Sequence, residues 1–389
     1  MFPSSYGVLY KTPDYYHPPE DTTALASNTY YPNLNSRDYA KRPHNRQLRI
    51  HPAWECVAAN VDGTYALATN KLTGREWSSS LWGFERREHI GAEKKSIYKL
   101  QCHSLISAMR FVAKNILLIS FHSGCVQLWS TKTEVRSINP YCLFMIGERY
   151  EHTHPILCLE QFHADSNKAI TGGKDCMLKI WDMGKADLTS VHTLRHAHSD
   201  VITGIATSLS QPNIFASCSL DKSTLLWDDR QARPAKAIYD NHTDCFKACA
   251  WATKAISPDE KIIHLGDEDG KILTCDIRKP NEYIEKFTYN DKPVRKILPR
   301  GSRLAVIGDS NKVKAFDGDV QIYESSEPRN FVRDGLWTSD DEFFTIGFDG
   351  QLRTHVVVAP HRCGQCDECV ADLEKKQKIL NLPKQEETP

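Results

Sequence analysis

The sequence lacks the features that mark a membrane or secreted protein. No run in its 389 residues approaches the roughly 20 consecutive apolar residues that a membrane-spanning helix requires. The first twenty residues contain neither the basic stretch nor the apolar stretch of a secretory signal peptide. We therefore expect an intracellular protein.

The sequence also lacks an excess of charge of either sign. Lys and Arg together number 49, and so do Asp and Glu. Nonspecific nucleic-acid binding normally needs a concentrated basic face, so we expect no direct binding of nucleic acid. The 40% hydrophobic and 25% charged content is ordinary for a globular domain.

The sequence contains many cysteines, but their number and positions do not indicate a disulfide framework. The 13 cysteines are an odd number, and most lie in strand-like segments, such as Cys56, Cys158, Cys218 and Cys249. In an intracellular chain of this length we expect them to be reduced residues of the core.

Four tryptophans recur at a nearly constant interval, each near the end of a strand-like segment. They lie about 46 to 52 residues apart, at Trp82, Trp129, Trp181 and Trp227, and Asp follows the last two. A period near 40–45 residues with strand signals and a closing Trp-Asp is typical of the blades of a β-propeller.

Two of these repeats share a set of polar residues that could form one hydrogen-bond network inside the blade. Each combines a His before the first strand, a hydroxyl in the second strand and an Asp in the next turn, six residues before the Trp. The sets are His152, Thr171, Asp175 and Trp181, and His198, Ser217, Asp221 and Trp227. The pattern could also suggest a catalytic Ser-His-Asp set. Because it occurs twice, we assign it to the repeat and expect no catalytic residue.

This series of regularly spaced positions, the tryptophan ladder, continues after Trp227 with other residues in place of Trp. Cys275, Phe316 and His355 keep the spacing. The sequence thus predicts an all-β protein, a seven-bladed WD40 propeller over residues 45–358. The predicted blades are residues 51–88, 95–138, 148–190, 191–235, 236–280, 281–322 and 323–358. We expect four antiparallel strands in each blade, with Arg46–His51 adding the outer strand of the last.

The two ends differ from the propeller in composition. Residues 1–44 are rich in Tyr and Pro and are predicted to be a disordered arm, although the clustered tyrosines could instead bind a partner. Residues 359–389 form a charged tail containing cysteines. Within it, His361, Cys363, Cys366 and Cys369 are a weak candidate for a zinc site. The alternative is an exposed, reduced segment, and we predict no metal or other cofactor.

Three surface features could bind partners. Trp77 is surplus to the repeat, and its polar surroundings favour an interface residue; alternatively, it folds over its own turn. Arg230 completes a WD-x-R pattern found in substrate receptors of cullin ubiquitin ligases, or it simply ends a polar turn. The acidic turns 267–269 and 340–342 could attract a basic tail, or they could be solvated turns.

Three stretches resemble the methylosome protein 50 and Valois family. They are GREWSSSLWGF (Gly74 to Phe84), the repeats ending KIWD and LLWDDR, and RNFVRDGLWTSDDEFFTIGFDGQLRTHVVV (Arg329 to Val358). The first and third are not generic features of WD repeats. The resemblance covers roughly residues 45–358, so it reaches neither the arm nor the tail.

The resemblance implies a noncatalytic adaptor present in cytoplasm and nucleus. Its partner would be a protein arginine methyltransferase that makes symmetric dimethylarginine, held in a hetero-oligomer. Blade one would dock on that enzyme, with Arg75 and Trp77 as the anchors. Arginine/glycine-rich substrates such as Sm proteins and histone tails would be presented to the enzyme. Glu76, between the two anchors, departs from the family pattern.

Overall fold

The computed structural model describes residues 48–73, 76–132, 143–184, 187–231, 233, 236–240 and 243–357. All of them belong to the unit Leu48–Pro389. The arm at residues 1–44 and the tail at 359–389 lie outside the described residues, and so do their proposed roles. No helix in the described part of the chain has the length and apolar character needed to cross a membrane.

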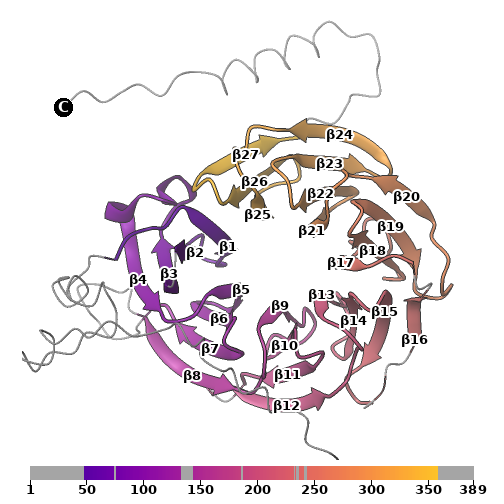
Figure 1. Cartoon of the computed structure of the whole chain (residues 1–389), viewed down its shortest axis with the longest axis horizontal. Coiled ribbons are helices and arrows are strands. Elements are labelled where there is room, and N and C mark those ends of the chain that lie inside the picture. Colours follow the sequence, from indigo (N-terminus) through magenta and orange to yellow (C-terminus); the bar gives the residue numbers. More distant parts are fainter. Residues whose placement is uncertain are drawn as a thin grey trace, which may run out of the picture. The chain divides into compact units, whose positions relative to one another are not determined.

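The described residues form seven antiparallel sheets arranged in a ring (Figure 1). Blade one comprises β1 (Ala53–Ala59), β2 (Tyr65–Thr73), β3 (Glu76–Phe84) and β4 (Ser96–Cys102), with the short 3-10 helices η1 (Arg87–His89) and η2 (Glu93–Lys95) before β4. Blade two comprises β5 (Ile106–Ala113), β6 (Ile116–Phe121), β7 (Cys125–Ser130) and β8 (Phe144–Tyr150). Blade three comprises β9 (Ile156–Gln161), β10 (Lys168–Gly173), β11 (Leu178–Asp182) and β12 (Thr189–Leu194).

The remaining blades follow the same order from the centre outward. Blade four comprises β13 (Ile202–Thr207), β14 (Ile214–Ser219), β15 (Ser223–Asp228) and β16 (Lys236–Asp240). Blade five comprises β17 (Phe246–Trp251), β18 (Ile262–Asp267), β19 (Lys271–Asp276) and β20 (Glu285–Thr288). Blade six comprises β21 (Val294–Arg300), β22 (Arg303–Gly308), β23 (Val313–Asp317) and β24 (Val320–Ser325). Blade seven comprises β25 (Val332–Trp337), β26 (Glu342–Gly347) and β27 (Leu352–Val356).

The predicted blade ranges were displaced by one strand. They placed β4 in the range of blade two and β20 in that of blade six, whereas each closes the preceding blade. The outer strands lie at the rim of the ring (Figure 1). The β20 strand alternates half-buried and exposed positions without a buried residue. Such strands bury little apolar surface and carry a weak sequence signal, so the clearest end of a repeat in the sequence is the end of its third strand.

Strand register places Cys275, Phe316 and His355 at the position that tryptophan holds in other blades. In blade three Trp181 pairs with Ala169, the second residue of its strand. Cys275, Phe316 and His355 pair with the second residues of β18, β22 and β26. The spacing of the ladder therefore identified equivalent positions even where the tryptophan is absent.

His355 takes over the polar role of the tryptophan as well as its position. Trp181 donates its indole N–H to Thr171 Oγ1 at 2.8 Å. The Nε2 atom of His355 lies 2.8 Å from Oγ1 of Thr345, and its Nδ1 lies 3.0 Å from the hydroxyl oxygen of Tyr323. Both ring nitrogens of this buried histidine are thus hydrogen-bonded.

The buried His355 makes the stability of the fold depend on pH. Burial, with a smaller effect of Arg353, lowers its pKa from 6.5 to about 4. Between those values the unfolded chain binds a proton that the folded chain does not bind. The free energy of unfolding should therefore fall as the pH drops from 6.5 to about 4. The contribution is roughly 1.4 kcal/mol per pH unit, or about 3 kcal/mol in total.

Urea unfolding at a series of pH values measures this dependence. The variant His355→Gln cannot titrate at this position, so its stability should decline less steeply over the same window. An equally steep decline in the variant and the natural protein would contradict the assignment.

In the described part of the chain no strand precedes β1, and blade seven has three strands and not the four predicted. Residues 48–51 of the predicted outer strand are not in a strand, which makes that prediction wrong for the part of Arg46–His51 that the structure describes. Instead, Leu48 and Ile50 pack their side chains into the apolar cluster that joins blade one to Phe344 and Ile346 of blade seven. Residues 48–51 therefore contribute to this junction through side-chain burial and not through strand pairing.

An ion-pair network ties the inner strands at the same junction. Glu55 of β1 accepts hydrogen bonds from Arg333 of β25 at 2.6 Å and from Arg295 of β21 at 2.8 Å. Asp334 accepts the backbone N–H of Val57 at 3.0 Å. Three blades therefore share one nearly buried carboxylate, which links the first blade to the last two.

Candidate functional site

The structure brings the predicted residues of the blade-three network together. The Nδ1 atom of His152 lies 2.8 Å from Asp175 Oδ2, and its Nε2 lies 2.8 Å from Thr171 Oγ1. Thr171 also accepts the indole N–H of Trp181. Burial acts to raise the pKa of Asp175, but the hydrogen bond with His152 and two backbone N–H groups outweigh it, so this pKa lies below its usual range.

The blade-four network repeats this geometry. His198 lies 2.9 Å from Asp221 and 2.7 Å from Ser217, which accepts the indole N–H of Trp227 at 2.8 Å. Burial opposes ionisation of Asp221, yet hydrogen bonds from His198 and Ser223 keep the pKa of this carboxyl below its usual range. The hydroxyls are engaged by both an imidazole and an indole inside the blade. We therefore assign both sets to structural hydrogen bonding.

Arg230 is engaged within its own turn. Its Nε donates to Asp228 Oδ1 at 2.8 Å and its Nη2 donates to Oδ2 at 2.5 Å. Arg278 makes the same two-pronged contact with Asp276 in blade five. A contact that recurs in two blades is typical of the repeat, which favours the turn interpretation of Arg230.

The second acidic turn is already neutralised within the chain. Asp340 accepts a hydrogen bond from Arg300 at 2.9 Å, and Asp341 accepts one from Arg303 at 2.7 Å. Glu342 forms an ion pair with Arg87 of η1. These contacts leave the turn with little unbalanced charge for a basic tail.

The hairpin of β2 and β3 extends beyond both neighbouring strands of blade one. Pairing with β1 ends at Asn70, and pairing with β4 ends at Ser79. Beyond these points β2 and β3 pair only with each other, through Leu72 opposite Trp77 and Thr73 opposite Glu76. The repeat accounts for the base of the hairpin. Its tip, residues 71–73 of β2 and 76–78 of β3, extends beyond the rest of the blade.

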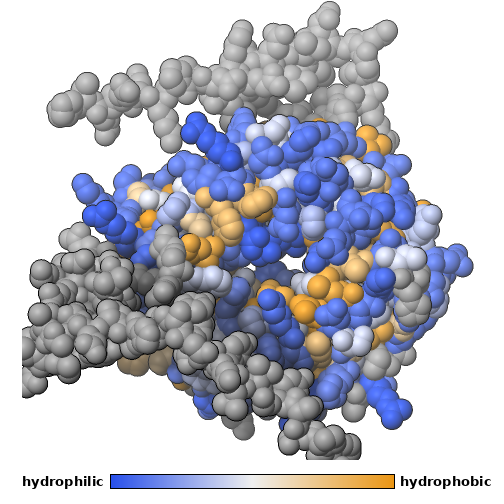
Figure 2. Space-filling model, viewed as in Figure 1, coloured by the Kyte–Doolittle hydropathy of each residue, from blue (hydrophilic) through white to orange (hydrophobic). Residues whose placement is uncertain are grey.

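An exposed apolar pair occupies this hairpin tip. Trp77 is 61% exposed and Leu72, directly opposite, is 46% exposed. Trp82, five residues after Trp77 on the same strand, points to the other face and is fully buried. On the face of the ring seen in Figure 2, hydrophilic residues predominate and apolar ones gather toward the centre. Its exposure shows that Trp77 is not packed into the core of its own blade.

The other predicted site residues fall outside the described part of the chain. Arg75 lies between β2 and β3 in the sequence, and His361, Cys363, Cys366 and Cys369 lie in the tail. Among the described residues, no group of three His, Cys, Asp or Glu side chains could hold a metal ion. The zinc hypothesis therefore stays a prediction about the tail.

Comparison with known proteins decides the family. A family model described as "WD domain, G-beta repeat" matches residues 145–182 and 188–228. Protein valois of Drosophila melanogaster is 35% identical over 368 residues, which cover 92% of this chain and 100% of that protein. The chain belongs to the Valois and methylosome protein 50 family.

A second relative and one solved structure place the family match in context. Methylosome protein WDR77 of Xenopus laevis is 27% identical over 302 residues, which cover 76% of this chain and 86% of that protein. A chain of the COPII outer coat vertex on membranes superposes with a TM-score of 0.65 at 17% identity, covering 80% of this chain and 86% of that one. At that identity the COPII likeness concerns the propeller fold alone.

Sequence reasoning missed Leu72 as a member of the site. The signal was present, because Leu72 and Trp77 are equidistant from the Gly74–Arg75 turn, and a two-residue hairpin places such residues opposite each other.

Proposed function

We propose that this chain is a noncatalytic adaptor subunit of a methylosome. It binds a type II protein arginine methyltransferase and helps present arginine/glycine-rich substrates, such as Sm proteins and histone tails, for symmetric dimethylation. Membership of the Valois and methylosome protein 50 family supports the choice of partner. We also propose that the complex acts in the cytoplasm and the nucleus.

The exposed pair of Trp77 and Leu72 is the observation that carries the docking proposal. Interface hot spots are enriched in tryptophan, and they are surrounded by contacts that exclude water. A two-stranded tip that projects past its blade places both side chains where a concave partner surface can enclose them. Arg75, at the turn between the strands, would add a charged contact.

A noncatalytic role agrees with the chemistry of the described residues. The two His-Asp-hydroxyl sets are engaged in blade hydrogen bonds, and each hydroxyl already accepts an indole N–H. The adaptor would therefore act by position, holding the enzyme assembly and orienting substrate tails.

Affinity purification of the full chain followed by mass spectrometry tests the choice of partner. We expect an arginine methyltransferase to co-purify, and the variant Arg230→Ala to recover it in equal amount, because Arg230 is paired with Asp228. The second candidate, a substrate receptor of a cullin ligase, predicts a ligase adaptor that is lost in Arg230→Ala. Recovery of such an adaptor without a methyltransferase would contradict our proposal.

A further inference from the structure

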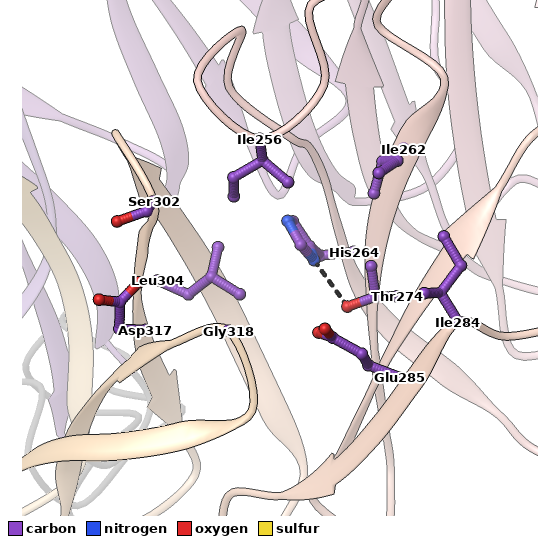
Figure 3. Close-up of a pocket in the computed structure, with 10 residues that line it drawn as sticks. All are labelled: Ile256, Ile262, His264, Thr274, Ile284, Glu285, Ser302, Leu304, Asp317 and Gly318. Carbon is purple, nitrogen blue, oxygen red and sulfur yellow. Dashed lines mark hydrogen bonds between the residues drawn. The ribbon is translucent and has the colours of Figure 1, made fainter.

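A cavity of about 240 Å³ lies between blades five and six. Figure 3 shows its lining, with His264, Thr274 and Glu285 from blade five on one side and Leu304 and Asp317 from blade six on the other. Pockets for drug-sized ligands are usually roughly 300–1,000 Å³. This cavity is smaller and suits a single side chain.

The cavity occurs where the repeat departs from its apolar pattern. In blade three the cross-strand pair Ile170 and Ile180 packs in one cluster with Trp227 of the next blade. The equivalent pair in blade five is His264 and Thr274, and the next blade has Phe316 at the tryptophan position. A polar pair and a smaller ring thus replace an apolar pair and an indole.

His264 presents an unpaired nitrogen to this cavity. The side chain is 2% exposed, and its Nδ1 lies 3.1 Å from Thr274 Oγ1. Its Nε2 has no hydrogen-bond partner among the described residues, and in Figure 3 it points away from Thr274 into the cavity. Burial lowers the pKa of His264 to about 4, so the ring is neutral near pH 7. In the tautomer that carries the proton on Nδ1, this atom donates to Thr274 Oγ1 and Nε2 is an acceptor without a donor.

The charge of the lining is negative and unbalanced. Glu285 and Asp317 both line the cavity, and no Lys or Arg is among its ten lining residues. In the described part of the chain neither carboxylate has an ion pair, unlike Asp340 and Asp341. In Figure 3 the Glu285 carboxylate points toward the middle of the cavity, below His264. Ile256 and Leu304 add apolar surface for a hydrocarbon stem.

We propose that this cavity binds the side chain of an arginine from a basic peptide. The guanidinium would donate to Nε2 of His264 and to the Glu285 carboxylate, and Asp317 would add attraction. The planar fork of a guanidinium can reach two acceptors at once, and it is more weakly hydrated than an ammonium group, so arginine suits this site better than lysine. The inference deepens the proposed function and rests on it, because it gives arginine-rich substrates a site on this chain.

The test titrates the purified full chain, without any methyltransferase, with N-acetyl-arginine-N-methylamide. NMR follows the nitrogen signals of His264. We expect saturable 1:1 binding that shifts the Nε2 signal. The matched citrulline compound has nearly the same shape but no charge, and it should bind about tenfold more weakly or worse. Equal binding of the two compounds, no binding, or tighter binding of the lysine compound would overturn the proposal.

Two variants locate the site. Glu285→Gln should weaken arginine binding by about tenfold. Glu88→Gln removes the same charge from an exposed position of η1 and should leave binding unchanged. Unaltered binding in Glu285→Gln would overturn the proposal. Because the methyltransferase is absent, this failure is distinct from a failure to co-purify the enzyme.

Discussion

Replacing Trp77 with alanine should weaken binding of the methyltransferase by about thirtyfold or more. The side chain is 61% exposed in the described part of the chain, so a partner that covers the tip would bury its apolar surface. Truncation of a central interface aromatic typically costs about 2–4 kcal/mol, and 2 kcal/mol corresponds to about thirtyfold in the dissociation constant. Surface plasmon resonance or calorimetry with the purified enzyme measures the change.

The fold itself should be indifferent to this substitution. Exposed side chains away from special features change the free energy of unfolding by about 0.5 kcal/mol or less. Phe144→Ala is the matched control, because Phe144 is a 69% exposed aromatic on the outer strand of blade two. Unimpaired binding by Trp77→Ala, or equal losses in the two variants, would refute the assignment of the hairpin tip.

Replacing Trp181 with alanine should lower the free energy of unfolding by about 3–5 kcal/mol, the usual cost of emptying an aromatic core site. Trp181 is fully buried, in a cluster with Leu128 of blade two and Leu188 of its own blade. The substitution leaves a cavity between two blades and removes the donor that Thr171 accepts.

Trp181→Phe separates the two effects. Phe316 holds the equivalent position in blade six, so a phenyl ring is compatible with the fold. We expect this variant to lose about 1–3 kcal/mol, since most of the ring is kept while the indole donor is lost. Urea unfolding monitored by circular dichroism measures both variants. Stability of Trp181→Ala equal to that of the natural protein would contradict a structural role for the ladder.

Most of the fold could be predicted from the local periodicity of the sequence. A repeat places equivalent residues at equivalent spacings, so Cys275, Phe316 and His355 could be assigned to tryptophan positions without any tryptophan. Hydrogen bonding of His152 with Asp175 could be anticipated in the same way, because the same set occurs in the next repeat. The outer strands bury few side chains, and so they left no such pattern.

The family resemblance carried the candidate site, and the register of β2 and β3 completed it. Trp77 is marked in the sequence because it lies outside the repeat, yet its exposure and its partner Leu72 depend on how far the hairpin extends past its neighbours. The cavity beside His264 had no signature, because its lining comes from strands and turns of two blades.

By itself, the sequence determined that this chain is a seven-bladed propeller and which tryptophan stands outside the repeat, since both follow from spacing along the chain. Only the tertiary structure decided how the ring closes, as Glu55 meets Arg295 and Arg333 there. It also decided that Trp77 and Leu72 are exposed and that Nε2 of His264 has no hydrogen-bond partner among the described residues. These features depend on contacts between blades, and such contacts join residues far apart in sequence that no local period relates.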